Sequence, residues 1–351
     1  MFGSGKRGAL EQKLADLETS IGRLSEQIEA LTQANAANAK PRGGALLKYL
    51  GVSPDRFLER YYENRPPADY YAALNGGSES LRGRPEKIGL TSGLCRQIHF
   101  STDEFRYWIN AMGRPVAMHR KDWELFYVAQ VLFERGMLEA GKKGLVFAVG
   151  HEPLPALFAS RGCEILATDQ APETAVAGGW IETGQHSAQA DALFDERLCP
   201  RDLFFAKVHY QSLDMNHIPD DLSDRFDFCW STCAFEHLGS LEHGLKFVER
   251  SIDTLAPGGV AVHTTEFNLS SNEDTLESPH LSVYRQKDMD ELAARLTAKG
   301  HEVTPFDWST GPGFAETVID LPPYKASPCL KLQIAQYDCT SVGIIVRKKA
   351  D

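Results

Sequence analysis

The sequence of 351 residues contains no stretch of 18 consecutive apolar residues, so it predicts no transmembrane segment. Its first residues become charged at once and do not have the layout of a signal peptide. It also lacks a cluster of lysine and arginine, and its formal net charge is −11, which argues against a protein that binds nucleic acid. These absences predict a cytoplasmic protein. Its 42% hydrophobic and 24% charged content suits a folded, soluble enzyme.

Cysteine occurs seven times, but no two cysteines form a CxxC pair. An odd and scattered set predicts neither a disulfide framework nor a zinc knuckle. We therefore expect the cysteines to be small buried side chains, and no metal-ligating set is predicted.

Near the N-terminus, seven aliphatic residues recur at alternating spacings of four and three. They are Leu10, Leu14, Leu17, Ile21, Leu24, Ile28 and Leu31. Isoleucine at most a positions with leucine at d favours a parallel two-stranded coiled coil. Residues 1–40 are therefore predicted to form a coiled-coil helix and linker that join two copies into a homodimer. Three heptads are marginal alone, so an amphipathic helix packed on its own domain is the alternative.

Residues 41–140 are predicted to be mainly helical. In residues 121–138, large apolar side chains including Trp123 and Phe126 recur at helical spacing, and Gly136 predicts the end of a helix. Residues 56–77 are rich in tyrosine and arginine. They could form a lid over a substrate, although ordinary packing explains them equally well.

From residue 141 onward, short β-rich runs alternate with helical stretches. The run LVFAV is followed by PALFASRG and then by CEILATD. This order is typical of a βαβ unit in a parallel sheet, which binds ligands at the carboxyl ends of its strands. The second run ends in Asp169, 19 residues after Gly150. An acidic residue at that place can accept hydrogen bonds from the ribose hydroxyls of a nucleotide.

The turn after Gly150 discriminates between nucleotide ligands. Pro153 and Pro155 have no N–H to offer a diphosphate, and Glu152 is an anion. A carboxylate about 4 Å from a phosphate would cost about 4 kcal/mol at an effective dielectric constant near 20. S-adenosylmethionine carries a sulfonium and an ammonium group and would tolerate Glu152. The alternative role for Glu152 is to cap the following helix.

Five further segments complete the pattern. Asp214 and Met215 lie in QSLDMNHIP, and the β-rich run FDFCWSTC is soon followed by Glu236 and His237. We expect Ser240 to cap a helix with an apolar face from Leu241 to Leu255 and a stop at residues 257–259. A helix over residues 288–300 and a last strand over 340–349 predict a doubly wound sheet that finishes in an antiparallel hairpin.

With these segments the chain resembles the class I S-adenosylmethionine-dependent methyltransferases over roughly residues 144–349. The glycine turn, Asp169, SLDM, FDFCWSTCAFEHL and LAPGG carry the resemblance. More narrowly, VGHEPLP and GCEILATD are similar to a bacterial subgroup with a VGxEPLP turn that is associated with surface-glycan biosynthesis. The resemblance implies an α/β fold: a doubly wound, Rossmann-like sheet of seven strands in a domain over residues 141–351.

The resemblance also implies a role in binding S-adenosylmethionine for each matching residue. Gly150 would pass under the methionine part, Asp169 would hold the ribose, and Asp214 with Met215 would bracket the adenine. Ser231 and Thr232 would line the methionine end. Two features depart from the family pattern: the usual glycine-rich turn has one glycine, and Ala148 replaces a common acidic residue. We expect Glu152 to supply the missing anion for the ammonium group.

The predicted reaction is methylation of an oxygen, or less readily a nitrogen, of a polar acceptor such as a sugar or glycan. A sugar hydroxyl needs a base at neutral pH, and His237 is the first candidate because its unperturbed pKa lies near working pH. Glu236 could orient the imidazole or bind the acceptor, and His263 is the second candidate base. The alternative is that Glu236 and His237 only begin the next helix.

Two more expectations concern the acceptor. His263, Glu266 and Asn268 lie along one predicted strand and could hydrogen-bond a polyhydroxylated molecule. The long stretch between Asp169 and Asp214 contains Trp180, Gln185 and His186, which could cover the donor or the acceptor. Two other functions stay open: a non-catalytic scaffold that joins partner enzymes through the coiled coil, and a nicotinamide-dependent oxidoreductase, which the Glu-Pro turn disfavours.

Overall fold

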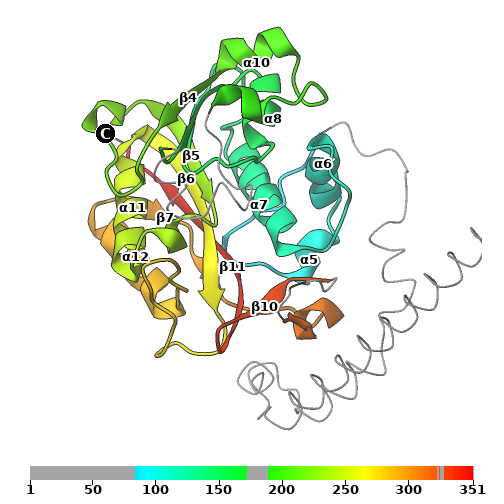
Figure 1. The fold of residues 1–351 in the computed structure, drawn as a ribbon, viewed down its shortest axis with the longest axis vertical. Helices are drawn as coiled ribbons and strands as arrows, with labels where there is room; N and C mark the ends of the chain where they lie inside the picture. Colours follow the sequence, from blue (N-terminus) through cyan, green and yellow to red (C-terminus); the bar gives the residue numbers. More distant parts are fainter. Residues whose placement is uncertain (1–83, 172–188, 322–323, 325–327, 351) are drawn as a thin grey trace, which may run out of the picture. The chain divides into compact units, whose positions relative to one another are not determined.

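The computed structural model describes residues 84–171, 189–321, 324 and 328–350, and a single sheet runs through them (Figure 1). Five parallel strands, with β4 at the edge, form one side of the sheet: β2 (Lys143–Val146), β3 (Glu164–Asp169), β4 (Val208–Ser212), β5 (Phe226–Thr232) and β6 (Leu255–Asn268). Their spatial order is β4-β3-β2-β5-β6, and each neighbouring pair is parallel. The chain therefore runs outward from β2 in one direction and then outward from β5 in the other. The ends of β2 and β5 mark the topological switch point.

The remaining strands extend the sheet beyond β6. Strand β11 (Tyr337–Arg347) is antiparallel to β6, and β10 (Lys331–Ile334) forms the predicted antiparallel hairpin with it. Strand β1 (Ser92–Leu94) also pairs with β11, and four short segments, β7 (Glu302–Val303), β8 (Phe306–Asp307), β9 (Ile319–Asp320) and β10, complete this side. In the described part the sheet has eleven strands. The expected number of seven is wrong, partly because β1 comes from the segment predicted to be mainly helical.

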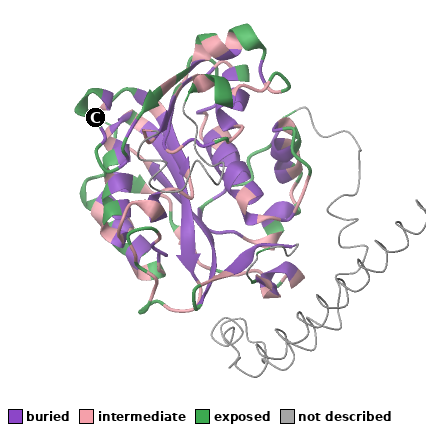
Figure 2. Ribbon diagram, viewed as in Figure 1, coloured by how far each residue is buried: buried purple, intermediate pink, exposed green. Residues whose placement is uncertain are grey.

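Helices cover both faces of the sheet, which confirms the doubly wound α/β class (Figures 1 and 2). One face packs against α6 (Asp103–Ala111), α7 (Arg120–Glu134), α8 (Leu154–Ser160) and α10 (Arg201–Lys207). The other face packs against α11 (Leu241–Asp253) and α12 (Gln286–Ala298). Short helices link these elements: α5 (Gln97–Phe100), η1 (Ala190–Leu193), η2 (Asp220–Leu222), η3 (Phe235–His237) and η4 (Phe314–Thr317). Successive residues of β5 serve opposite faces, since Phe228 and Trp230 contact the first core and Cys229 the second.

Helix α7 confirms the helix predicted over residues 121–138, and it lies directly on the sheet. It contacts β5, β6 and β11, and twelve of its fifteen residues are buried. Gly343 on β11 permits this close approach, because a Cβ at that position would overlap the ring of Tyr127. Residues 84–140 therefore share a sheet and a core with the rest of the described chain.

Several local predictions can be compared with the structure. The Ser240 side chain accepts a hydrogen bond from the His243 N–H and so caps α11 as expected. However, α11 ends at Asp253, and Leu255 begins β6 instead of continuing the helix. All seven cysteines are free thiols, and six are buried.

Some expectations concern residues outside the described part of the chain. These are the coiled coil and homodimer contact over Leu10 to Leu31, the tyrosine-rich segment 56–77, and the candidates Trp180, Gln185 and His186. Within the described part, no helix has both the length and the apolar character that are needed to cross a membrane.

Candidate functional site

Gly150 and Asp169 meet at the carboxyl ends of β2 and β3. Gly150 has a φ of +50°, and its N–H donates to Asp169 Oδ2 at 3.0 Å. Asp169 Oδ1 accepts a hydrogen bond from the N–H of Gln170 at 2.9 Å. Asp169 is 6% exposed, and its carboxylate is thus held beside the glycine turn at the edge where doubly wound sheets bind nucleotides.

Glu152 connects this turn to the end of β5. Its carboxylate accepts hydrogen bonds from Trp230 Nε1 at 2.6 Å and from Thr232 Oγ1 at 2.8 Å. Burial raises the pKa of Glu152 to about 7, although these two hydrogen bonds act in the opposite direction. Helix α8 starts after Pro153 without a side-chain cap. The helix-cap alternative for Glu152 is therefore wrong, because its carboxylate spans the switch point instead.

Asp214 and Met215 follow β4 at the same edge of the sheet. The N–H of Leu213 donates to the carbonyl of Asp169 at 2.8 Å, which ties this turn to the end of β3. Asp214 accepts hydrogen bonds from the Asn216 N–H at 2.8 Å and from His217 Nδ1 at 2.7 Å, with 59% of its side chain exposed. Met215 is 8% exposed. The structure thus brings three of the expected donor-binding positions, Asp169, Asp214 and Met215, to adjoining strand ends.

His263 and Ser231 lie inside the core. His263 is fully buried, with Ser231 Oγ 2.8 Å from its Nδ1 and Ser251 Oγ 2.9 Å from its Nε2. Burial lowers the pKa of His263 to about 3. A neutral ring with both nitrogens engaged cannot take a proton from an acceptor, so the prediction of His263 as a second candidate base is wrong. Ser231 is also fully buried and does not line an open methionine end, whereas Thr232 holds Glu152.

His263 and Glu266 are predicted to contact the same acceptor, but their side chains point to opposite faces of β6. They are three residues apart, and strand side chains alternate with a period of two. His263 contacts Phe247 of α11, whereas Glu266 pairs with Arg120 of α7. Asn268 is 3% exposed and donates to the carbonyl of Asp274 at 3.0 Å, so it stabilises the loop after the strand.

His237 lies on η3, just beyond β5, with 28% of its side chain exposed. Its Nδ1 is 2.6 Å from the carbonyl oxygen of His280. A carbonyl can only accept, so the neutral ring carries its proton on Nδ1 and keeps the lone pair on Nε2. Nε2 lies 4.0 Å from Glu236 Oε1, which is too long for a hydrogen bond. The His280 carbonyl, which no sequence pattern singled out, therefore orients the ring.

Glu236 is fully buried on the same turn. Its Oε2 accepts a hydrogen bond from Thr265 Oγ1 at 2.9 Å. Burial raises the pKa of Glu236, against the opposing effect of His237. Glu236 is thus packed behind His237 instead of standing at the surface beside it.

Three charged side chains from α7 meet one from β6, and no sequence pattern predicted this group. The members of this ionic cluster are Arg120, Lys121, Glu124 and Glu266. Arg120 Nη1 lies 2.7 Å from Glu266 Oε1 and 3.3 Å from Glu124 Oε1. Lys121 Nζ lies 3.2 Å from Glu124 Oε2. Only the tertiary contact between α7 and β6 brings the four side chains together. The sequence of the helix alone indicates an aromatic-rich element of the core.

Cys233 lies next to the ionic cluster, immediately after β5. Its φ is +43°, and its Sγ donates to Glu124 Oε1 at 3.0 Å. Burial, reinforced by the charge of Glu124, raises the pKa of this thiol well above its usual value. The sequence predicts that the cysteines are small buried side chains. Of the seven thiols, however, Cys233 is the one that is partly exposed.

Comparisons with known proteins give structural similarity only. No protein-family model matches the chain, and no curated protein sequence matches it. Among solved structures, an S-adenosylmethionine-dependent methyltransferase from Methanosarcina mazei is 13% identical with a TM-score of 0.40, covering 62% of this chain and 98% of its own. A putative sarcosine dimethylglycine methyltransferase from Galdieria sulphuraria is 13% identical with a TM-score of 0.35, covering 71% and 99%. The [4+2]-cyclase SpnF is 16% identical with a TM-score of 0.41, covering 75% and 98%. With identities and scores this low, the fold assignment rests on the strand order of the chain itself.

Proposed function

We propose that this chain is an S-adenosylmethionine-dependent methyltransferase that acts on a polar acceptor. The observation that carries the proposal is the placement of two acids at the switch point: Asp169 held by the Gly150 turn, and Glu152 held by the end of β5. Asp169 suits the hydroxyls of a ribose, and Glu152 suits a cationic group.

The donor would lie along the ends of β2, β3 and β4. Carboxylate oxygens have more than one lone pair, so Asp169 can accept from ribose hydroxyls while it keeps the Gly150 N–H. Asp214 has an exposed carboxylate one strand further out, where it could accept from the exocyclic amine of adenine, and Met215 would pack on the ring. Glu152, when ionised, would attract the ammonium group of the methionine part.

The same geometry weighs against a nicotinamide dinucleotide. A diphosphate at this turn would meet the Glu152 carboxylate and the residues Pro153 and Pro155, where a dinucleotide site offers N–H groups. Like charges in this half-buried position would repel, so the oxidoreductase alternative finds no support from the turn.

Methyl transfer would take place at the ends of β5 and β6, where His237 lies. S-adenosylmethionine, when bound, would supply the methyl group, which would pass to the acceptor oxygen as its bond to sulfur breaks and would leave S-adenosylhomocysteine. The proton of the acceptor hydroxyl goes to Nε2 of His237, whose Nδ1–H stays on the His280 carbonyl. A sugar or other polyhydroxylated acceptor fits this chemistry, since its hydroxyl groups do not ionise at neutral pH.

Titration calorimetry of the full chain with S-adenosylmethionine, S-adenosylhomocysteine and NAD tests the proposal. We expect the first two ligands to bind and NAD not to bind. Asp169→Ala should weaken donor binding about 30-fold, or by about 2 kcal/mol, because hydrogen bonds to a charged group are worth about 1.5 to 3 kcal/mol.

Asp290→Ala is the matched control, because it removes an exposed acid of α12 and should leave donor affinity unchanged. A wild-type chain that binds neither donor nor product would overturn the proposal and favour the scaffold alternative. Equal affinities of wild type and Asp169→Ala would remove Asp169 from the site.

A further inference from the structure

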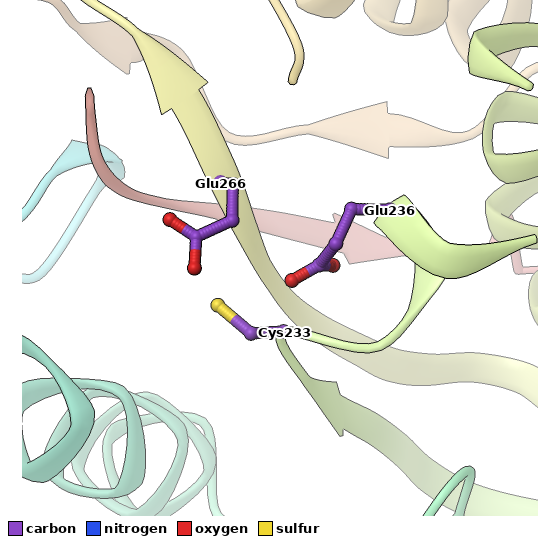
Figure 3. Close-up of side chains that lie close together, drawn as sticks. All are labelled: Cys233, Glu236 and Glu266. Atoms are coloured by element: carbon purple, nitrogen blue, oxygen red, sulfur yellow. The ribbon is translucent and has the colours of Figure 1, made fainter. Parts of the chain in front are cut away.

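Three potential metal ligands converge beside the ionic cluster. Figure 3 shows Cys233 at the end of β5, Glu236 on η3 and Glu266 on β6, with their side chains directed toward one another. One ligand atom from each side chain lies within 4.8 Å of the other two. Atoms spaced in this way can reach a single ion placed between them.

Each carboxylate is anchored through one oxygen and presents the other. Glu266 Oε1 is held by Arg120, and Glu236 Oε2 is held by Thr265. The second oxygens, Glu236 Oε1 and Glu266 Oε2, are buried and have no hydrogen-bond partner among the described residues. Glu236 is fully buried and Glu266 is 6% exposed. Buried polar atoms are normally satisfied, so two such oxygens beside a thiol call for a ligand.

We propose that Cys233, Glu236 and Glu266 bind one divalent transition-metal ion of the zinc class. A thiolate with two carboxylates suits Zn²⁺, which accepts sulfur and oxygen ligands, whereas Ca²⁺ and Mg²⁺ prefer oxygen alone. Three protein ligands leave a fourth position for water or an acceptor atom, as in catalytic zinc sites. The anchored oxygens fix the orientation of the ligands in the way that supporting hydrogen bonds do in such sites.

The charges nearby are consistent with a dication. Arg120 and Lys121 are balanced by Glu124 and Glu266, so the metal-free site is neutral when Glu236 and Cys233 both carry protons. Binding of a divalent ion forms bonds from the metal to sulfur and to the Glu236 carboxylate and releases these two protons to solvent, which leaves the site neutral again.

Cobalt binding tests the site directly and requires neither donor nor acceptor, so its result is independent of the proposed methyl transfer. The full chain is freed of metal with a chelator and titrated with Co²⁺. We expect saturation at one ion per chain with a thiolate-to-cobalt charge-transfer band, and displacement of Co²⁺ by Zn²⁺. A titration without this band overturns the proposal.

Matched variants assign the ligands. Cys233→Ser should abolish the charge-transfer band, whereas Cys199→Ser, at a buried thiol elsewhere, should retain it. Glu236→Gln should weaken Co²⁺ binding by more than about 100-fold, since loss of a supporting group alone typically costs about 10- to 100-fold. A band that survives Cys233→Ser overturns the assignment.

A measurement on the wild-type chain tests the site even if the variants do not fold. Stoichiometric Zn²⁺ should slow alkylation of Cys233 at least about tenfold, read by peptide mass spectrometry, because a metal-bound thiolate is shielded from the reagent. Alkylation at the same rate with and without Zn²⁺ argues against the site even if no variant folds.

Discussion

Acidic side chains lie along the edge of the sheet at which the parallel strands have their carboxyl ends. Those in the two halves of this edge are held in different ways. At the ends of β3 and β4, Asp169 and Asp214 accept hydrogen bonds from backbone N–H groups of their own turns or of the turn after β2, and Asp214 also accepts one from the side chain of His217. At the ends of β5 and β6, Glu236 and Glu266 are held by side chains, and Glu266 relies on Arg120 from a distant part of the chain. The first half is built from the backbone of one βαβ region, whereas the second is assembled by tertiary packing.

This difference has energetic consequences. A carboxylate bound by backbone amides keeps those partners whichever neighbouring side chain is changed. A buried carboxylate that depends on one guanidinium loses its main compensation when that group is removed. We therefore expect the loss of Arg120 in the second half to act mainly on folding, and substitutions near β2 to β4 to act mainly on ligand binding.

The largest expected effect is on stability. Arg120→Met should lower the free energy of unfolding by about 3 to 5 kcal/mol, because it leaves Glu124 and Glu266 buried without their guanidinium partner. Urea titration followed by circular dichroism measures the change. Arg295→Met is the control, because Arg295 pairs with Glu242 and Glu291 in a partly exposed position and should cost only about 1 kcal/mol or less. Equal losses for the two variants would contradict the contrast between the halves.

The next effect concerns turnover. His237→Ala should reduce methyl transfer at least about 100-fold, because a positioned base typically contributes about 10² to 10⁴ in rate. Donor affinity should stay within a few-fold of wild type, since the ring lies beyond β5 and not at the Asp169 turn. Formation of S-adenosylhomocysteine with an acceptor found by screening polyhydroxylated compounds gives the rate. His209→Ala, at an exposed position of β4, is the control. A His237 variant that keeps most of its turnover would exclude this residue as the base.

Features that depend on neighbouring residues could be predicted from the sequence. The alternation of runs around Gly150 located two parallel strands and placed Asp169 at their shared edge, where the structure has it. The aromatic spacing predicted α7, and Ser240 was recognised as a helix cap. Each of these rests on a period or a turn that a few consecutive residues define.

Features that depend on tertiary packing could not be predicted. No local pattern shows that Ser92–Leu94 joins the sheet beside β11, because three residues define no period. His263 was misplaced because its position on the opposite face from Glu266 matters only once α7 and α11 cover the two faces. Likewise, Cys233 and Glu124 are 109 residues apart, and only the fold brings them together. The coiled coil over Leu10 to Leu31 stays a prediction.

The smallest expected effect concerns Glu152, where the two halves of the edge meet. A substitution there should change the free energy of unfolding and the donor affinity in opposite directions. Burial raises the pKa of Glu152 to about 7, well above its ordinary value near 4.5. The folded chain therefore holds this proton more tightly than the unfolded chain, and the resulting stability is fully present below pH 4.5 and is lost as pH rises through about 7.

Glu152→Gln should therefore make the chain more stable than wild type by about 1 to 2 kcal/mol at pH 8, with no gain near pH 4. The amide can still accept from Trp230 and donate to Thr232, so no partner of the carboxylate is left unsatisfied. Donor affinity should change in the opposite direction, because a neutral amide no longer attracts the ammonium group. Glu152→Asp, which keeps the charge, should bind the donor more tightly than Glu152→Gln. Urea titrations at both pH values and donor calorimetry at pH 8 measure the two changes. A Gln variant that gains stability yet binds the donor as well as wild type would show that Glu152 only joins the turn to β5 and does not contact the methionine part.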